Sequence, residues 1–338
     1  MKKEKITWMK TGKEILELGV TDIPKLLEPI IQKYGVVSLA GSSDLGKSYF
    51  LLQLTDAIIN GAEEFLGLKL NIEHKSAIYL TTEDDEFALC PRLTKMASKW
   101  DNTNAFENLR LLFDSKDLLD RIDTMLTEKP ADLVVIDTFT DIYDGDMNQS
   151  NKIRSFIQKF KELATKHKTL MIFNHHCGKR NDLRPPHKDN LLGSQGFESS
   201  MRTVMELRRD YSNPDIRHLC VVKGNYVDAS LKHSSYVLKF DYEGDGFTNT
   251  GERVSFDKLA KTDELITATR ELTKEKVLAL NKEGLSYEKI AKALKEEGIQ
   301  ISKSTVGNIC KDNRPSIQMP LDEKMTGQLV EFQKREVV

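Results

Sequence analysis

Gly41-Ser42-Ser43-Asp44-Leu45-Gly46-Lys47-Ser48 is a complete phosphate-binding loop, and it decides the fold class of this chain. The apolar run 36–40 precedes it, and residues 49–54 read as the first turns of a buried helix. This order of strand, loop and helix is the context that the motif requires. A chance match of its four fixed positions is expected in roughly 1 of 100 chains this long. The sequence therefore predicts a nucleotide-binding loop.

The loop supplies the groups that hold a nucleoside triphosphate. In this motif, backbone N–H groups and the helix N-terminus wrap the β-phosphate. We expect Lys47 to neutralise β- and γ-phosphate oxygens, and the Ser48 hydroxyl to bind Mg²⁺. ATP and Mg²⁺ are therefore the expected cofactors. The expected nucleotide-binding residues are Gly41, Ser42, Ser43, Asp44, Leu45, Gly46, Lys47, Ser48 and Tyr49.

The charge composition is nearly balanced. The 338 residues include 50 Lys and Arg against 52 Asp and Glu, so any nucleic-acid partner must be held by local patches. No apolar run is long enough to span a membrane, and the first residues carry no hydrophobic signal core. The cysteines are far apart, which is typical of a reducing compartment and argues against a structural zinc site. We expect a cytoplasmic protein without a membrane partner. The cysteines are Cys90, Cys177, Cys220 and Cys310.

From residue 36 to about residue 240, short apolar runs alternate with longer amphipathic stretches. This alternation predicts an α/β fold with a mostly parallel, doubly wound sheet, which we assign to a domain of residues 1–260. A turn at Glu243-Gly244-Asp245-Gly246 predicts an antiparallel hairpin at the sheet edge. Strands are expected at residues 36–40, 77–80, 109–113, 133–136, 170–174, 203–207, 219–222 and 236–240.

The composition changes near residue 261, and three short helical patterns follow. They cover residues 273–282, 286–297 and 302–311; each begins at a Thr or Ser cap, and Gly298 ends the second. This layout predicts a helix-turn-helix domain over residues 261–314, although its linker is longer than the tightest turns. A trihelical module that is purely structural or binds protein fits equally well. Residues 315–338 are polar, and we interpret them as a tail.

Two further segments carry acids that suit ATP hydrolysis. Residues 131–137 form an apolar strand that ends in Asp137, as in a Walker B segment, where the acid holds Mg²⁺ through water. The alternative is a strand that ends at a solvated Asp. Glu83 follows the neighbouring strand and is the expected base that polarises the attacking water. Asp84 or Asp85 remain alternatives for this role, or caps for the next helix.

The strand at 170–174 is followed by His175-His176-Cys177 and a long basic loop. A polar group at this strand end can sense the γ-phosphate and pass its loss to the loop. A zinc site of these three residues fails, because consecutive residues of an extended segment point in opposite directions. We expect the loop to face single-stranded DNA, although it lacks stacking aromatic residues and a plain solvated loop is the alternative. Its candidate DNA-binding residues are Lys179, Arg180, Arg184 and Lys188.

Six segments occur in an order that is found in one ATPase family. They are 41–48, Tyr79-Leu80-Thr81-Thr82-Glu83-Asp84-Asp85, 133–138, Asn174-His175-His176, 193–202 and Lys223-Gly224-Asn225-Tyr226. This order resembles the RepA-like branch of the RecA-type ATPases, which are plasmid and mobile-element relatives of the hexameric replicative helicases. The resemblance covers residues 8–240. The segments around Glu83 and His175-His176 are its most specific features, since many folds share the phosphate loop.

The resemblance implies roles for single residues. It implies that Glu83 is the catalytic glutamate, that Asp137 is the metal-side acid, and that His176 or His175 couples the γ-phosphate to DNA. It also implies a ring, such as a hexamer, in which a neighbouring subunit inserts basic fingers. Lys223 matches the lysine finger, but Asn225 stands where an arginine often follows. Either Arg202 takes the arginine role, or the ring is weaker or regulated.

The sequence therefore predicts an ATPase that couples hydrolysis to movement on DNA or to its remodelling. The C-terminal domain would bind duplex DNA through groove-facing residues such as Lys303 and Lys311, or bind a protein. Two alternatives stay open. One is an ATP-switched DNA-binding regulator or accessory factor without unwinding activity, and the other is a recombination mediator.

Overall fold

The computed structural model describes residues 9–312, except 101–102, 179–180, 194, 244–245, 261–262, 297–298 and 300. The chain divides into two compact units, Met1–Lys261 and Thr262–Val338. Several predictions fall outside the described residues. They concern Lys179 and Arg180 of the basic loop, the middle of the turn at 243–246, the helix stop at Gly298 and the tail 315–338.

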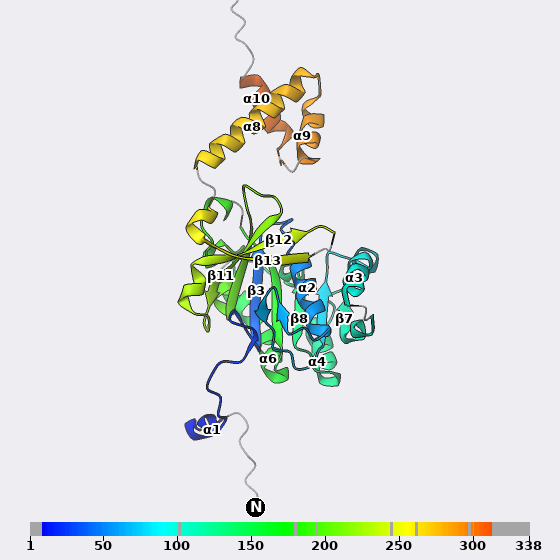
Figure 1. Cartoon of the computed structure of the whole chain (residues 1–338), viewed down its shortest axis with the longest axis vertical. Coiled ribbons are helices and arrows are strands. Elements are labelled where there is room, and N and C mark those ends of the chain that lie inside the picture. Colours follow the sequence, from blue (N-terminus) through cyan, green and yellow to red (C-terminus); the bar gives the residue numbers. More distant parts are fainter. Residues whose placement is uncertain are drawn as a thin grey trace, which may run out of the picture. The chain divides into compact units, whose positions relative to one another are not determined.

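The first unit is built on one large mixed sheet (Figure 1). Its described strands lie in the order β13-β12-β11-β10-β3-β9-β8-β6-β7, so the phosphate-loop strand is central. The six strands from β10 to β7 pair in parallel, which confirms the predicted α/β class. These parallel strands are β3 (Gly35–Gly41), β6 (Ala77–Thr81), β7 (Leu109–Leu112), β8 (Leu133–Asp137), β9 (Leu170–His176) and β10 (Thr203–Arg209).

Helices cover both faces of the sheet, because the strand side chains alternate between two apolar cores. Val37, Leu39 and Tyr79 belong to one core, with α2 (Lys47–Ile59), α3 (Glu86–Trp100) and η1 (Thr103–Asn108). Val36, Ile78 and Leu80 belong to the other. That core includes α4 (Leu118–Glu128), α5 (Phe139–Ile142), α6 (Ser150–His167) and α7 (Gln195–Ser200). A strand buried on both faces is apolar throughout, which is why the apolar runs identified these strands.

The antiparallel part of the sheet is larger than the single predicted hairpin. β10 pairs antiparallel with β11 (Ile216–Gly224), which pairs with β12 (Ser234–Asp241), and β12 pairs with β13 (Gly246–Ser255). Short connections between β10, β11, β12 and β13 permit this, since parallel pairs need a long crossover. Small elements outside the large sheet are α1 (Gly12–Leu16), β1 (Lys25–Leu27) with β2 (Ile31–Gln32), β4 (Glu64–Phe65) with β5 (Leu68–Lys69), η2 (Asn181–Leu183), η3 (Lys188–Asn190), η4 (Ala229–Lys232) and η5 (Phe256–Leu259).

The second unit contains α8 (Asp263–Lys282), α9 (Tyr287–Glu296) and α10 (Lys303–Asp312). Val277, Ile290, Leu294, Val306 and Cys310 form its own apolar core. The Ser286 and Ser302 hydroxyls accept hydrogen bonds from the N–H groups of Lys289 and Thr305, at 3.4 and 3.1 Å, as expected of N-caps.

The predicted start of the first C-terminal helix, at a Thr273 cap, is wrong. The helix α8 begins ten residues earlier, at Asp263, and Thr273 lies inside it. Residues 263–272 contain neither Pro nor Gly, so nothing in that stretch breaks the helix. Among the described helices, none is long and apolar enough to cross a lipid bilayer.

Candidate nucleotide site

The phosphate loop joins β3 to α2 at the carboxyl edge of the parallel strands, the usual ligand-binding edge of such sheets. Two glycines are required by its shape. Gly46 has φ +86°, and a Cβ there would lie 2.9 Å from Cζ of Phe247. A Cβ on Gly41 would lie 2.6 Å from the carbonyl oxygen of Leu207. Phe247 of β13, which sequence reasoning did not connect to the loop, therefore lies directly against it.

Lys47 is folded over the loop that it belongs to. Its side chain is buried, and Nζ donates a 2.8 Å hydrogen bond to the carbonyl oxygen of Ser42. Burial lowers the pKa of Lys47, while the nearby carboxylates of Asp137 and Glu83 act in the opposite direction. The ammonium group is thus held on the loop, within reach of the charges of Asp137 and Glu83.

Two side chains fix the orientation of Asp137 at the end of β8. The Tyr79 hydroxyl donates a 2.7 Å hydrogen bond to Oδ2, and the Asn174 amide donates to Oδ1. Burial, followed by the charge of Asp137, raises the pKa of Tyr79, so its hydroxyl remains a donor. Sequence reasoning missed both roles. Polar residues at the ends of the two flanking strands, β6 and β9, were the available signal.

The structure separates the three consecutive acids after β6. Asp84 forms an ion pair with Arg92 at 2.6 Å, and Oδ1 of Asp85 accepts a 2.8 Å hydrogen bond from the N–H of Ala88 at the start of α3. Glu83 has no hydrogen bond or ion pair within the described chain. Burial, then the charges of Asp137 and Asp141, raises its pKa, and Lys47 opposes them. Of the three acids, Glu83 is therefore the one free to contact water beside Lys47 and Asp137.

His175 and His176 point in opposite directions from β9. His175 is fully buried, its Nε2 lies 2.8 Å from the carbonyl oxygen of Leu192, and its ring stacks on Phe197 at 4.1 Å. Burial lowers the pKa of His175 to about 4, so its neutral ring donates from Nε2. His176 is half-buried; burial and then Lys47 lower its pKa, while Asp137 raises it. His176 is therefore the histidine on the nucleotide side.

Comparisons with known proteins bear on the first unit. A family model described as an AAA domain matches residues 19–182. A solved structure described as an ATPase domain is similar in fold, with a TM-score of 0.52 and 14% identity over 70% of this chain and 95% of that chain. A KaiC-like protein from Pyrococcus horikoshii OT3 gives a TM-score of 0.47 and 20% identity, over 66% and 93% of the two chains. No curated protein matches this sequence.

The first unit has a RecA-like P-loop fold. The strand before the loop, β3, lies at the centre of the sheet, and β8, which ends in Asp137, lies two strands away. The remaining candidate residues lie elsewhere in the first unit or in the second unit.

The basic loop after β9 is anchored to β10 by a buried ion pair that sequence reasoning missed. Arg208 and Glu206 lie 3.5 Å apart with side chains 4% and 2% exposed. Arg208 donates 2.7 Å hydrogen bonds to the carbonyl oxygens of Arg184 and Asn181, and Glu206 accepts one of 3.2 Å from the N–H of His187. Two charged residues inside the apolar run 203–208 were the signal. The Arg184 and Lys188 side chains are exposed, as a nucleic-acid contact requires.

Lys223 and Arg202 lie near the amino ends of the parallel strands, away from the phosphate loop. Thr203 pairs with Val37 at the start of β3 and with Gly224, so Arg202 lies roughly 15 Å along the strand direction from Gly41. Lys223 forms a 2.9 Å ion pair with Glu198 and donates to its carbonyl oxygen at 2.8 Å. Neither side chain is placed to contact a phosphate on the loop of its own chain.

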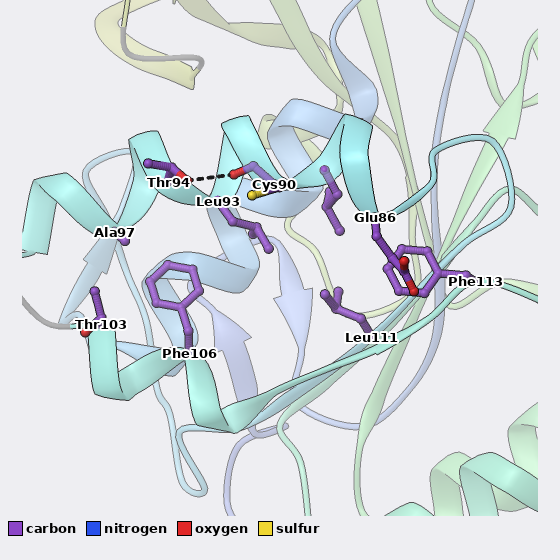
Figure 2. Close-up of a pocket in the computed structure, with 10 residues that line it drawn as sticks. Glu86, Cys90, Leu93, Thr94, Ala97, Thr103, Phe106, Leu111 and Phe113 are labelled. Atoms are coloured by element: carbon purple, nitrogen blue, oxygen red, sulfur yellow. Dashed lines mark hydrogen bonds between the residues drawn. The ribbon is translucent and has the colours of Figure 1, made fainter.

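An apolar pocket of about 410 Å³ lies away from these groups (Figure 2). Leu93 and Ala97 of α3 form one wall, and Phe106 and Leu111 lie on η1 and β7 opposite them. No phosphate-loop residue lines it. It is therefore separate from the candidate nucleotide site.

The two DNA candidates in the second unit differ in their surroundings. Lys303 at the start of α10 forms a 3.2 Å ion pair with Glu288 of α9, and both side chains are largely exposed. Lys311 is exposed in the last turn of α10. Exposed pairs contribute little to stability, so both ammonium groups remain accessible to an anionic partner.

Proposed function

We propose that this protein is an ATP-hydrolysing, DNA-associated motor or remodelling ATPase, of the RepA-like kind found in plasmids and mobile elements. One observation carries the proposal: Lys47, Asp137, Glu83 and His176 converge at one sheet edge, and the basic loop leaves that edge directly after His176. A nucleotide-dependent change at His176 would therefore reach the loop within two residues.

The residues of the site suit Mg²⁺ bound to a triphosphate. Magnesium prefers oxygen ligands and retains several waters, and the Ser48 hydroxyl with the fixed Asp137 carboxylate provides such oxygens. Both Asp137 oxygens already accept hydrogen bonds from Tyr79 and Asn174, which favours contact with the ion through water. When bound, Mg²⁺ would neutralise charge that develops on the phosphates.

Hydrolysis itself would depend on Glu83. Its carboxylate is unpaired in the described chain and lies near Lys47, where the attacking water would be oriented. Lys47 would exchange its Ser42 hydrogen bond for phosphate oxygens. His176 would contact the γ-phosphate region, and loss of that phosphate would change its contacts and so the position of the loop.

Coupling to DNA would use the exposed side chains of Arg184 and Lys188, with Lys179 and Arg180 of the same loop. The ion pair of Arg208 with Glu206 holds this loop on β10, two strands from β9 at the nucleotide site. The loop would bind single-stranded DNA through its phosphates. The second unit would bind duplex DNA through Lys303 and Lys311.

The proposal includes assembly into a homo-oligomer, such as a hexameric ring, and the position of Lys223 and Arg202 supports it. Because Lys223 and Arg202 lie at the sheet edge opposite the phosphate loop, they can serve a nucleotide only on a neighbouring subunit. Lys223 would then leave Glu198 for a phosphate. Val204 pairs with Lys223, and the N–H of Asn225 donates a 3.1 Å hydrogen bond to the carbonyl oxygen of Arg202. Arg202 therefore lies opposite Asn225, which supports it as the replacement for the arginine missing there.

The test is ATP turnover by the full chain with single-stranded DNA, with duplex DNA and without DNA. A motor requires stimulation by single strands. Particle mass should be measured on the same sample, with and without a non-hydrolysed ATP analogue, and should increase with the analogue. ATP turnover that is not stimulated by single-stranded DNA would contradict the proposed motor activity.

The second candidate is an ATP-switched DNA-binding regulator without unwinding activity. The separate apolar core of α8, α9 and α10 favours it, since such a unit can bind duplex DNA without a motor. Response to one specific duplex, with no response to single strands, would identify this function.

A further inference from the structure

The sheet edge opposite the nucleotide site contains a second cavity, of about 430 Å³. It lies where β3 begins, where α6 ends, and beside the start of β10. Its polar and aromatic lining residues include Gln32, Tyr34, Lys161, Lys168, Arg202 and Tyr226. Because β3 is seven residues long, this cavity is roughly 20 Å from the phosphate loop of the same chain.

The cations of this cavity are not neutralised by its walls. None of the described residues lining it is acidic. Lys161 has no ion-pair partner within the described chain, and burial followed by the charges of Arg202 and Lys223 lowers its pKa. Two acids outside its lining are paired: Glu198 pairs with Lys223, and Glu73 pairs with Lys33. Like charges gathered in a partly buried cavity repel one another unless an anion joins them.

Gln32 contributes a buried N–H donor that lacks an acceptor among the described residues. Gln32 is 5% exposed, and its Oε1 accepts a 2.9 Å hydrogen bond from the Thr203 hydroxyl. Its Nε2 has no acceptor among the described residues. A Cβ at Gly35 would lie 3.8 Å from this Nε2 and 3.9 Å from Cγ of Arg202, so the glycine leaves room between the two. A buried N–H group without an acceptor is costly and indicates a missing partner.

We propose that this cavity binds a phosphate group carried by a molecule no larger than a mononucleotide. Gln32 Nε2, Lys161 and Arg202 would hold the phosphate, since ammonium, guanidinium and amide donors suit its oxygens. Tyr34 and Tyr226 add aromatic surface, and the volume is in the range of small-ligand sites. The phosphate can come from a free ligand or from a nucleotide bound on a neighbouring copy.

The first arm of the test uses a free ligand and does not depend on ATP hydrolysis. Pyrophosphate is titrated calorimetrically into full-length Lys47→Ala protein, whose phosphate loop is weakened. Adding Lys161→Ala should raise the dissociation constant about tenfold or more, the effect of one lost charge-assisted contact. Lys159→Ala, an exposed lysine on the same helix, should change it less than about twofold. Gln32→Glu keeps the shape of the side chain and the acceptor for Thr203 but adds a repelling charge, so it should also weaken binding about tenfold.

The second arm tests whether the phosphate belongs to a nucleotide bound on a neighbouring copy of the chain. Lys161→Ala chains and, separately, Lys159→Ala chains are mixed with Lys47→Ala chains. If the phosphate belongs to a neighbour, Lys161→Ala chains alone should lose turnover, and mixing them with Lys47→Ala chains should restore part of it per intact loop, because each Lys47→Ala chain supplies an intact cavity. Lys159→Ala chains should keep their turnover alone and show no such gain on mixing. Thermal unfolding of each variant within a few degrees of wild type shows that the fold is kept.

Weakened pyrophosphate binding in the first arm supports a free ligand as the source of the phosphate. Recovered turnover in the second arm supports a nucleotide on a neighbouring copy. Equal behaviour of Lys161→Ala and Lys159→Ala in both arms, with Gln32→Glu unchanged in the first, would overturn the proposed phosphate cavity. Failure of the motor proposal is recognised separately, by the absence of single-strand stimulation in wild-type protein.

Discussion

The two edges of the parallel sheet carry different chemistry. At the carboxyl edge, one buried lysine faces Asp137 and Glu83, and Tyr79 and Asn174 orient the metal-side acid. At the amino edge, Lys161, Arg202 and Lys223 gather, and Glu198 pairs with Lys223. In the proposed function, the first set would bind a metal-bound triphosphate and orient water, whereas the cations of the second set would bind an anion. Because one sheet separates the two sets, they can act on one phosphate only across a boundary between chains.

The largest effect expected at the carboxyl edge comes from Lys47→Ala. The change removes the loop cation that faces the β- and γ-phosphates, so ATP turnover should fall to background. Nucleotide affinity should fall by about 1.5–3 kcal/mol, which is typical of a lost charge-assisted contact. Turnover is measured by phosphate release and affinity by calorimetry, with exposed Lys159→Ala as the matched control. Wild-type turnover in Lys47→Ala would refute the site.

The next largest effect concerns Glu83→Gln. ATP should remain bound while kcat falls by about 10²–10⁴-fold, the range for a lost general base. Glu86→Gln, at an exposed position at the start of α3, should leave kcat unchanged. An unaffected Glu83→Gln enzyme together with a strongly impaired Asp84→Asn enzyme would assign the role to Asp84 instead.

The raised pKa of Glu83 also predicts that kcat depends on pH. Burial and the neighbouring carboxylates raise its pKa above the ordinary value of 4.5. A base must be deprotonated, so kcat should fall as the pH decreases through this raised pKa, at a higher pH than an ordinary carboxylate would give. The acid limb of the kcat profile should disappear in the residual activity of Glu83→Gln.

A smaller effect is expected from mixing two inactive variants, which tests whether Lys223 of one chain acts on the nucleotide of another. Lys223→Ala chains and Lys47→Ala chains should each be inactive alone. In an equal random mixture, about a quarter of the interfaces would join an intact loop to an intact finger, so turnover should recover up to about that fraction. The mixture must be shown to contain both chains in one particle. If no turnover returns in such particles, Lys223 does not act as a finger.

The sequence was most informative where the backbone makes the site. The phosphate loop needs glycines at fixed positions and a strand before it, so Gly41 to Ser48 could be placed without coordinates. The parallel strands could be placed because burial on both faces makes them apolar throughout. The orientation of Asp137 by Tyr79 and Asn174 could not be predicted, since it depends on which strands are neighbours. The cavity of Gln32, Lys161 and Arg202 joins residues from three distant segments, and no local pattern marks it.

The smallest effect on ATP turnover is expected from removing the second unit. Deleting residues 263–338 should leave the ATPase domain folded, because the second unit has its own core of Val277, Ile290 and Leu294 and the first unit has its own two. Basal turnover and its response to single strands should stay within about twofold, while duplex affinity drops. Circular dichroism and turnover check the domain, and binding to labelled duplex checks the loss.

Charge reversal in α10 examines the same unit without a deletion. Lys311→Glu should weaken duplex binding and make its dependence on salt shallower, since each lost phosphate contact lowers the slope of log affinity against log salt by roughly 1. Lys303→Glu should act in the same direction and would also place a second carboxylate beside Glu288, so its α9–α10 contact should weaken as well. Lys295→Glu, a reversal in the last turn of α9, gives the matched control on the neighbouring helix. If the deletion abolishes oligomers and both reversals leave duplex affinity intact, the unit binds protein, and DNA contact is confined to the loop at the carboxyl edge.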